Sequence, residues 1–179
     1  MIKNVVKNLG DSELTYQQEV VLEFIDDFST FFNTWSIENY EELRKLFTQG
    51  FCWQFAKMLQ ATFDRGTVCM AFPKAHMVWV DDDNTAYDID GIDITECYYY
   101  IPEEYLGNQI INFKHIPHKW VIPASRGELI EIAKKYCDDN GIEIDKQLIY
   151  ELLVKLLNSF RHGETHAFYF LSNLASTSI

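Results

Sequence analysis

The sequence lacks any run of about 18 uncharged apolar residues, the length that a membrane-spanning helix needs. Residues 1–11 contain lysines but neither an apolar segment nor a small-residue cleavage site, so a secretory signal peptide is not expected. No two of the four cysteines are spaced as Cys-x-x-Cys, which excludes zinc-ribbon and thioredoxin-type motifs. We therefore expect a cytoplasmic protein with reduced thiols and no membrane partner.

Basic residues are also scarce. Lysine and arginine together number 15 against 27 aspartates and glutamates, which gives a formal net charge of −12. Binding to a nucleic-acid backbone or to an anionic membrane relies on lysine and arginine, so neither is an expected partner. The charge favours solubility and does not bear on the fold.

Apolar residues, by contrast, are abundant. The chain has 179 residues, of which 47% are hydrophobic and 15% aromatic, enough for one sizeable core. We see no internal repeat, no low-complexity segment and no linker long enough to separate domains. The sequence predicts one domain over residues 1–179, with flexible ends at 1–14 and 175–179, and does not indicate an oligomeric state.

The first third of the chain has the helical period of apolar residues. Residues 16–33 form one such stretch, and Thr15 with Gln18 makes a capping box at its start. A second helix is expected from Ser36 to about Gly50, and a third over residues 52–63. The apolar positions of the third helix should pack inward, namely Phe55, Ala56, Leu59 and Phe63.

After residue 66 the apolar period changes from helical to two. This pattern predicts strands over 67–72, 76–80 and 85–89, the last two joined as a hairpin by a polar turn at 81–84. Further along, the sequence predicts a strand at 98–100, a helical turn at 102–107 and a short strand at 120–123. Two helices are expected next, one at 125–141 with Ser125 as its cap and one at 148–160 with Asp145 as its cap, and then a helix or strand at 166–174. The expected fold class is α+β, with N-terminal helices packed on an antiparallel sheet and two further helices on the C-terminal side.

Three residues of this pattern suggest chemistry. Cys52 follows Gly50 at the expected start of a helix, where unpaired backbone N–H groups and a nearby imidazolium would lower the pKa of a thiol. His76 opens a strand, and Asp88 lies on the neighbouring strand of the hairpin, where it can orient the histidine ring. Asp90 lies on the same face as Asp88 and is the alternate carboxylate.

The same stretch carries a family resemblance. Its elements are Gly-x-Cys-x-x-Phe-Ala at 50–56, an apolar strand beginning at His76, and Tyr-Asp-x-x-Gly at 87–91. This order resembles papain-like and transglutaminase-like bacterial proteins, the superfamily that also holds the NlpC/P60 hydrolases. The resemblance spans residues 50–91 and rests on the order and context of a few residues.

The resemblance implies a papain-like fold and acyl transfer through a thioester. Cys52 would be the nucleophile, His76 the base and Asp88 the orienting residue, and no cofactor or metal is implied. The substrate would be a peptide, a protein or another amide-containing molecule. The function that we expect is therefore a cysteine-dependent amide or isopeptide hydrolase, or an acyltransferase.

One position departs from the family pattern. Papain-type enzymes carry an oxyanion glutamine several residues before the cysteine, and here Leu46 stands at that spacing. Gln49 and Gln54 are the alternates for that role. The departure supports a second hypothesis, a catalytically silent papain-like module that binds a protein partner. A third is a structural or phage-type accessory protein in which Cys52 is a core residue.

The remaining motifs are weaker. Two pairs of histidines, at 115 and 118 and at 162 and 166, offer only two ligands each, so no metal site is expected. The acidic residues 81–83 lack the glycine and the distal glutamate of a calcium loop, and we expect a solvated hairpin tip. The other cysteines lie in apolar segments and are expected to be inert, namely Cys69, Cys97 and Cys137.

Overall fold

The structure is a computed structural model of the whole chain. It describes residues 14–35, 40–48, 50–74, 76–93, 97, 99–112, 119–121 and 126–161. The chain divides into two compact units, Met1–Ile122 and Pro123–Ile179, which are taken separately below. None of the helices in the described ranges is long and apolar enough to cross a membrane. The prediction of a single domain stays a prediction.

Three α-helices begin the first unit: α1 (Tyr16–Trp35), α2 (Tyr40–Thr48) and α3 (Cys52–Phe63). The expected capping box at the start of α1 is present, because the Thr15 N–H donates to Gln18 Oε1 at 3.0 Å and the Gln18 N–H donates to Thr15 Oγ1 at 3.3 Å. These two bonds satisfy N–H groups that have no partner within the helix. The prediction for α3 is confirmed at both ends.

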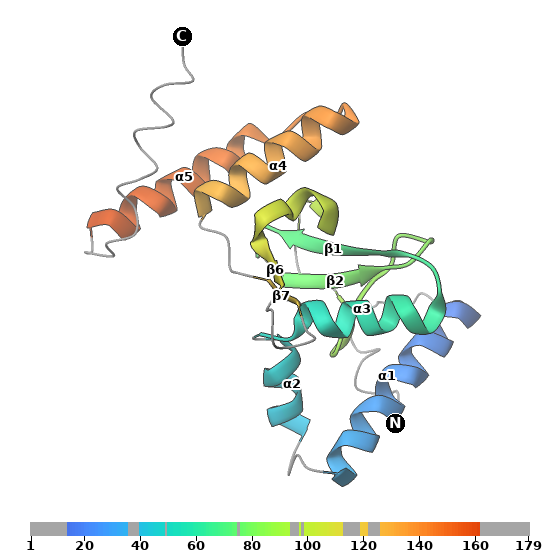
Figure 1. Cartoon of the computed structure of the whole chain (residues 1–179). Coiled ribbons are helices and arrows are strands. Elements are labelled where there is room, and N and C mark those ends of the chain that lie inside the picture. Colours follow the sequence, from blue (N-terminus) through green and yellow to red (C-terminus); the bar gives the residue numbers. More distant parts are fainter. Residues whose placement is uncertain are drawn as a thin grey trace. The chain divides into compact units, whose positions relative to one another are not determined.

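A five-stranded sheet lies at the centre of this unit (Figure 1). Its order is β4-β3-β2-β1-β5, and every neighbouring pair is antiparallel. The bounds of its strands are β1 (Thr67–Phe72), β2 (His76–Val80), β3 (Ala86–Asp88), β4 (Gly91–Ile92) and β5 (Tyr99–Pro102). The first two strands have the predicted bounds, and the α+β class with an antiparallel sheet is confirmed.

A short 3₁₀ segment follows the sheet, η3 (Glu103–Gln109), where a helical turn was expected. It leads into a separate two-stranded antiparallel sheet of β6 (Ile110–Asn112) and β7 (Lys119–Val121). Neither β4 nor β6 was predicted. Strands of two or three residues are too short for an alternating pattern to become visible in a sequence.

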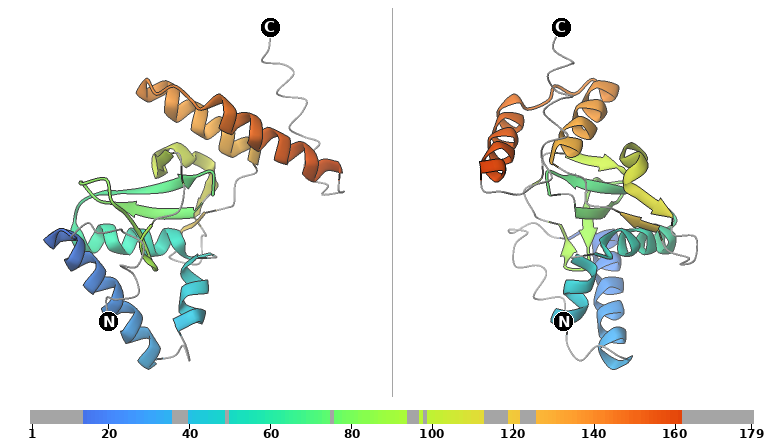
Figure 2. Two further views of the ribbon diagram at one scale, coloured as in Figure 1. Left: turned by 180° about the vertical axis from the view of Figure 1, so that it is seen from behind. Right: turned by 60° about the vertical axis from the view of Figure 1, so that its left-hand side comes forward.

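Helix α3 packs along one face of the five-stranded sheet, as the views in Figures 1 and 2 agree. Its residues Phe55 and Leu59 are buried, as expected, and so are Met77 and Trp79 on β2. The ring of Phe63 stacks on that of Trp79 with centroids 5.3 Å apart. Such aromatic contacts add to the area buried, so this face forms the core of the unit.

A tight turn joins α3 to β1. Asp64 ends the helix in the left-handed conformation, and its N–H donates to the Gln60 carbonyl oxygen at 2.9 Å. Gly66 follows with a φ of +70°, and a Cβ at this position would lie 2.5 Å from Trp79 Nε1 and from the Val80 carbonyl oxygen. Only glycine fits, because both the conformation and the space exclude a side chain.

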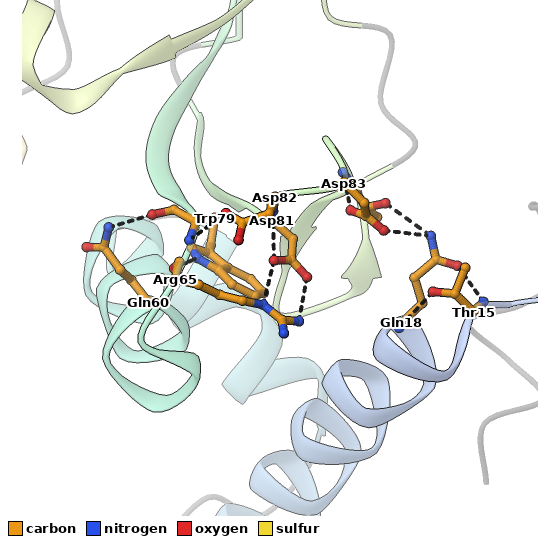
Figure 3. Close-up of polar contacts among 10 residues, drawn as sticks. Thr15, Gln18, Gln60, Arg65, Trp79, Asp81, Asp82 and Asp83 are labelled. Atoms are coloured by element: carbon orange, nitrogen blue, oxygen red, sulfur yellow. Dashed lines mark hydrogen bonds and ion pairs between the residues drawn. The ribbon is translucent and has the colours of Figure 1, made fainter.

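The hairpin tip between β2 and β3 corrects one expectation (Figure 3). Asp82 and Asp83 are exposed, but the Asp81 side chain is only 1% exposed and is not solvated. Its two oxygens accept hydrogen bonds from Nε and Nη2 of Arg65, both at 2.7 Å. A carboxylate can be buried in this way because a bidentate guanidinium replaces its water.

The second unit contains α4 (Arg126–Asn140) and α5 (Lys146–Arg161), which pack against each other. Asp145 caps α5 as predicted, because its Oδ1 accepts from the N–H groups of Gln147 and Leu148 at 2.9 and 3.0 Å. Apolar side chains of both helices are buried, namely Leu129, Ile130, Ala133, Cys137 and Leu148. The expected Ser125 cap, the segment 166–174 and the chain ends apart from Leu14 lie outside the described residues.

Candidate active site

Cys52 is the first residue of α3. The chain enters this helix from α2 through a hydrogen bond of 3.0 Å from the Phe51 N–H to the Leu46 carbonyl oxygen. Phe51 is the N-cap and makes no side-chain capping bond. The first N–H groups of α3 therefore stay available to other acceptors, and the partial positive charge of the helix N-terminus lies beside Cys52.

His76 and Asp88 lie at the ends of neighbouring strands. His76 begins β2 and Asp88 ends β3, and their side chains are 16% and 12% exposed. His76 Nε2 is 2.9 Å from Asp88 Oδ2, the distance of a hydrogen bond. The histidine expected to open the strand and the aspartate expected on the next strand are thus in direct contact.

The sulfur of Cys52 completes the cluster. It lies close enough to the His76 side chain and to the backbone N–H groups of Trp53 and Met77 for each of them to lower the pKa of the thiol. Because His76 Nε2 faces Asp88, the other ring nitrogen, Nδ1, is left for the sulfur. The structure brings Cys52, His76 and Asp88 together in the order thiol, imidazole, carboxylate.

The surroundings of the cluster favour charge separation. Burial raises the pKa of the Cys52 thiol, but the hydrogen bonds from His76, Met77 and Trp53 and the charge of His76 outweigh it, so the pKa lies below its ordinary value. Burial lowers the pKa of His76, yet Asp88 and Cys52 together raise it to about 10. Both shifts favour the ion pair of a thiolate and an imidazolium over a neutral thiol beside a neutral ring.

Asp90, the alternate carboxylate, has a different place. Its side chain forms an ion pair with Arg44 of α2, with Asp90 Oδ1 2.6 Å from Arg44 Nε. Its backbone N–H donates to Asp88 Oδ1 at 2.8 Å. His76 therefore pairs with Asp88, and Asp90 contacts the cluster through its main chain.

The positions considered for an oxyanion site are less well defined. Leu46, at the spacing of the family glutamine, is 39% exposed near the end of α2. Gln54 lies in the first turn of α3 and is half-buried, and Gln49 lies outside the described residues. The structure adds a feature that sequence reasoning missed, the backbone N–H of Met77 on β2 near the sulfur, because a main-chain group of a distant strand leaves no trace in the residue types.

The other cysteines have different surroundings from Cys52. Cys69 is 4% exposed, and burial raises its pKa to about 12, with a smaller contribution from the charges of Glu103 and Glu104. Burial also raises the pKa of Cys97, and Cys137 is 1% exposed within the second unit. These surroundings agree with the expectation that Cys52 is the reactive cysteine, which stays a prediction.

Metal ligands do not gather in the described part of the chain. No group of three or more histidine, cysteine, aspartate or glutamate side chains there could hold a metal ion. The histidines at 115, 118, 162 and 166 lie outside the described residues.

Fold and cluster together define an α+β protein with a cysteine, a histidine and an aspartate in contact where a helix begins against an antiparallel sheet. The chain belongs to the family of Phage YunG-like proteins, whose family model matches residues 29–120, slightly more than half of the chain. The matched segment includes Cys52, His76 and Asp88. No curated protein and no solved structure is significantly similar to this chain.

Proposed function

We propose that this protein is a cysteine-dependent hydrolase or acyltransferase that acts on an amide or isopeptide bond through a thioester. The observation that carries the proposal is the contact of Cys52 with His76 and of His76 with Asp88, at 2.9 Å for the second pair. A nucleophile, a base and an orienting carboxylate in hydrogen-bond reach are the parts that covalent acyl transfer needs.

The reaction follows from this order. The Cys52 thiolate attacks the carbonyl carbon of the amide and forms a tetrahedral intermediate. His76 gives its proton to the leaving nitrogen, the carbon–nitrogen bond breaks, and an amine leaves behind a thioester. Water or a second amine then attacks the thioester, His76 takes up its proton, and the Cys52 thiolate leaves. Asp88 keeps the ring oriented in both halves.

An oxyanion must be stabilised in each half of the reaction. Among the candidates is the backbone N–H of Cys52, which lies at the N-terminus of α3. Gln54 is the side-chain alternate within the described residues. A peptide N–H and a helix N-terminus can act without the glutamine that Leu46 replaces, since both present positive charge without a side chain.

The wider features of the protein belong to the same proposal. The order of helix, sheet and cluster supports a papain-like arrangement. The proposed substrate is a peptide, a protein or another amide, and the proposed location is the cytoplasm. The family name places related proteins in phages, so a target in an infected bacterial cell fits the proposal.

A second candidate function is a catalytically silent module that binds a protein partner. The observation in its favour is Leu46, an apolar side chain that is 39% exposed where papain-type enzymes carry a glutamine. An exposed apolar side chain at that position suits contact with a partner better than stabilisation of an oxyanion.

A trapping experiment separates the two functions. The full chain is incubated with a panel of peptide amides, quenched in acid and measured by intact mass, with Cys52→Ala as the control. The hydrolase predicts an acyl adduct on Cys52 that neutral hydroxylamine removes. A Cys52 that alkylates at pH 6 but never acquires an adduct would favour the binding module.

A further inference from the structure

The two oxygens of the Asp88 carboxylate have different partners. Oδ2 lies 2.9 Å from His76 Nε2, while Oδ1 accepts the backbone N–H of Asp90 at 2.8 Å. The second bond stops the carboxylate from rotating about its Cβ–Cγ bond, because rotation would break both contacts at once. The direction in which Asp88 faces the ring thus depends on where the Asp90 backbone lies.

The Asp90 backbone is in turn tied to a helix. The Asp90 side chain pairs with Arg44 of α2, which lies 46 residues away in the sequence, and Arg44 Nε donates to Asp90 Oδ1 at 2.6 Å. Leu46, two residues further along α2, accepts a hydrogen bond from the N–H of Phe51, the residue directly before Cys52. Arg44 therefore links the turn after β3, which carries Asp90, to the helix that leads into Cys52.

We propose that Arg44 and Asp90 are positioning residues of the active site, whose ion pair holds the turn after β3 so that Asp88 faces His76. Neither touches the reacting atoms. The proposal rests on the proposed function, since positioning matters only if the cluster reacts. It assigns Asp90 a role distinct from that of an alternate to Asp88.

Exposure to solvent limits how much the Arg44–Asp90 ion pair can affect the reactivity of Cys52. The side chains of Arg44 and Asp90 are 44% and 33% exposed, so water and salt screen their attraction. Pairs of this kind contribute little, and we expect a loss of up to about fivefold in the alkylation rate of Cys52 at pH 6. Removal of the Asp88 charge itself should cost about tenfold or more, because that carboxylate contacts the ring.

The test is a double-mutant cycle on the full chain. Arg44→Gln, Asp90→Asn and the double variant are alkylated with iodoacetamide between pH 4 and pH 9, and the acid limb of the Cys52 rate profile is compared. Asp90→Asn keeps the backbone N–H that Asp88 accepts and removes the charge that pairs with Arg44. Lys135→Gln, which removes the exposed pair with Asp139 on α4, is the matched control, and Asp88→Asn is the positive reference.

Positioning through the ion pair predicts that each single variant moves the acid limb to higher pH, that the double variant moves it no further, and that Lys135→Gln leaves it in place. The inference would be overturned if the acid limb stayed in place in both single variants, or if its shift in the double variant were the sum of the two single shifts. If Asp88→Asn still shifts the limb in that case, the proposed function stands alone. If Asp88→Asn has no effect either, the proposed function fails as well.

Discussion

His76 reaches Asp88 diagonally across the β2–β3 hairpin. The paired residues are Trp79 with Tyr87 and Val80 with Ala86, and this register, continued along the strands, would set His76 opposite Asp90. The pairing ends at Asp88, however, and the chain turns through Asp90 into β4. Diagonal neighbours on one face of a hairpin lie within reach of a long side chain, so the ring meets Asp88 at 2.9 Å.

The first prediction concerns selectivity among the thiols. Substoichiometric iodoacetamide at pH 6 should label Cys52 before Cys69, Cys97 or Cys137, because an ordinary thiol with a pKa near 8.5 is less than about 1% ionised at that pH. The His76 contact lowers the pKa of Cys52, whereas burial raises that of Cys69 to about 12. Peptide mapping of the labelled protein is the measurement, and preferential label on any other cysteine would contradict it.

The second prediction ranks the partners of Cys52. His76→Ala should abolish the low-pH reactivity of Cys52, because the imidazolium contacts the sulfur directly. Asp88→Asn should reduce it less, by about tenfold or more, since the carboxylate acts through the ring. Alkylation rates at pH 6 measure both effects. A larger loss in Asp90→Asn than in Asp88→Asn would mean that the wrong aspartate has been chosen.

The third prediction concerns stability and pH. The pKa of His76 is raised to about 10 in the folded protein, above its unfolded value near 6.5. The stabilisation from its charged form is therefore complete below about pH 6.5 and is lost as the pH rises toward 10. The pKa of the Cys52 thiol is lowered, so its contribution to stability changes with pH in the opposite direction. The measurement is therefore made in a variant that lacks this thiol.

Urea unfolding of Cys52→Ala is compared with that of Cys52→Ala/His76→Gln from pH 6 to pH 10. At pH 6 the double variant should be less stable by about 1.5–3 kcal/mol, the range for a hydrogen bond to a charged group. The difference should shrink as the pH rises and be lost before pH 10, because the part of the raised pKa of His76 that comes from Cys52 is absent in this background. A difference that grows with pH would show that the histidine is neutral in the folded protein.

The fourth prediction concerns the buried ion pair at the hairpin tip. Arg65→Ala should lower the free energy of unfolding by about 3 kcal/mol, because it leaves the 1%-exposed Asp81 carboxylate without its guanidinium. Lys135→Ala, which breaks an exposed pair on α4, should cost no more than about 0.5 kcal/mol. Chemical denaturation measures both, and equal losses would mean that Asp81 is solvated as the sequence suggested.

Local elements followed from the sequence alone. The bounds of α3, β1 and β2 were predicted, because the change of apolar period from helical to two lies at the Asp64–Gly66 turn. The caps at Thr15 and Asp145 were also identified, since a cap depends on residues no more than a few positions apart. Such features need no knowledge of the rest of the fold.

The candidate site was only half determined in this way. The sequence indicated Cys52 and His76 and favoured Asp88 over Asp90 as the carboxylate that faces the ring, but it did not show what fixes that choice. That choice depends on where β3 stops, on the Asp90 N–H that holds Asp88, and on the pair with Arg44, which is 46 residues away in the chain. The burial of Asp81 against Arg65 was likewise invisible, because an acidic turn looks the same whether or not a guanidinium from another segment reaches it. Periodicity and caps are local properties of the chain, whereas the partner of a charged side chain is decided by which distant segments tertiary packing brings together.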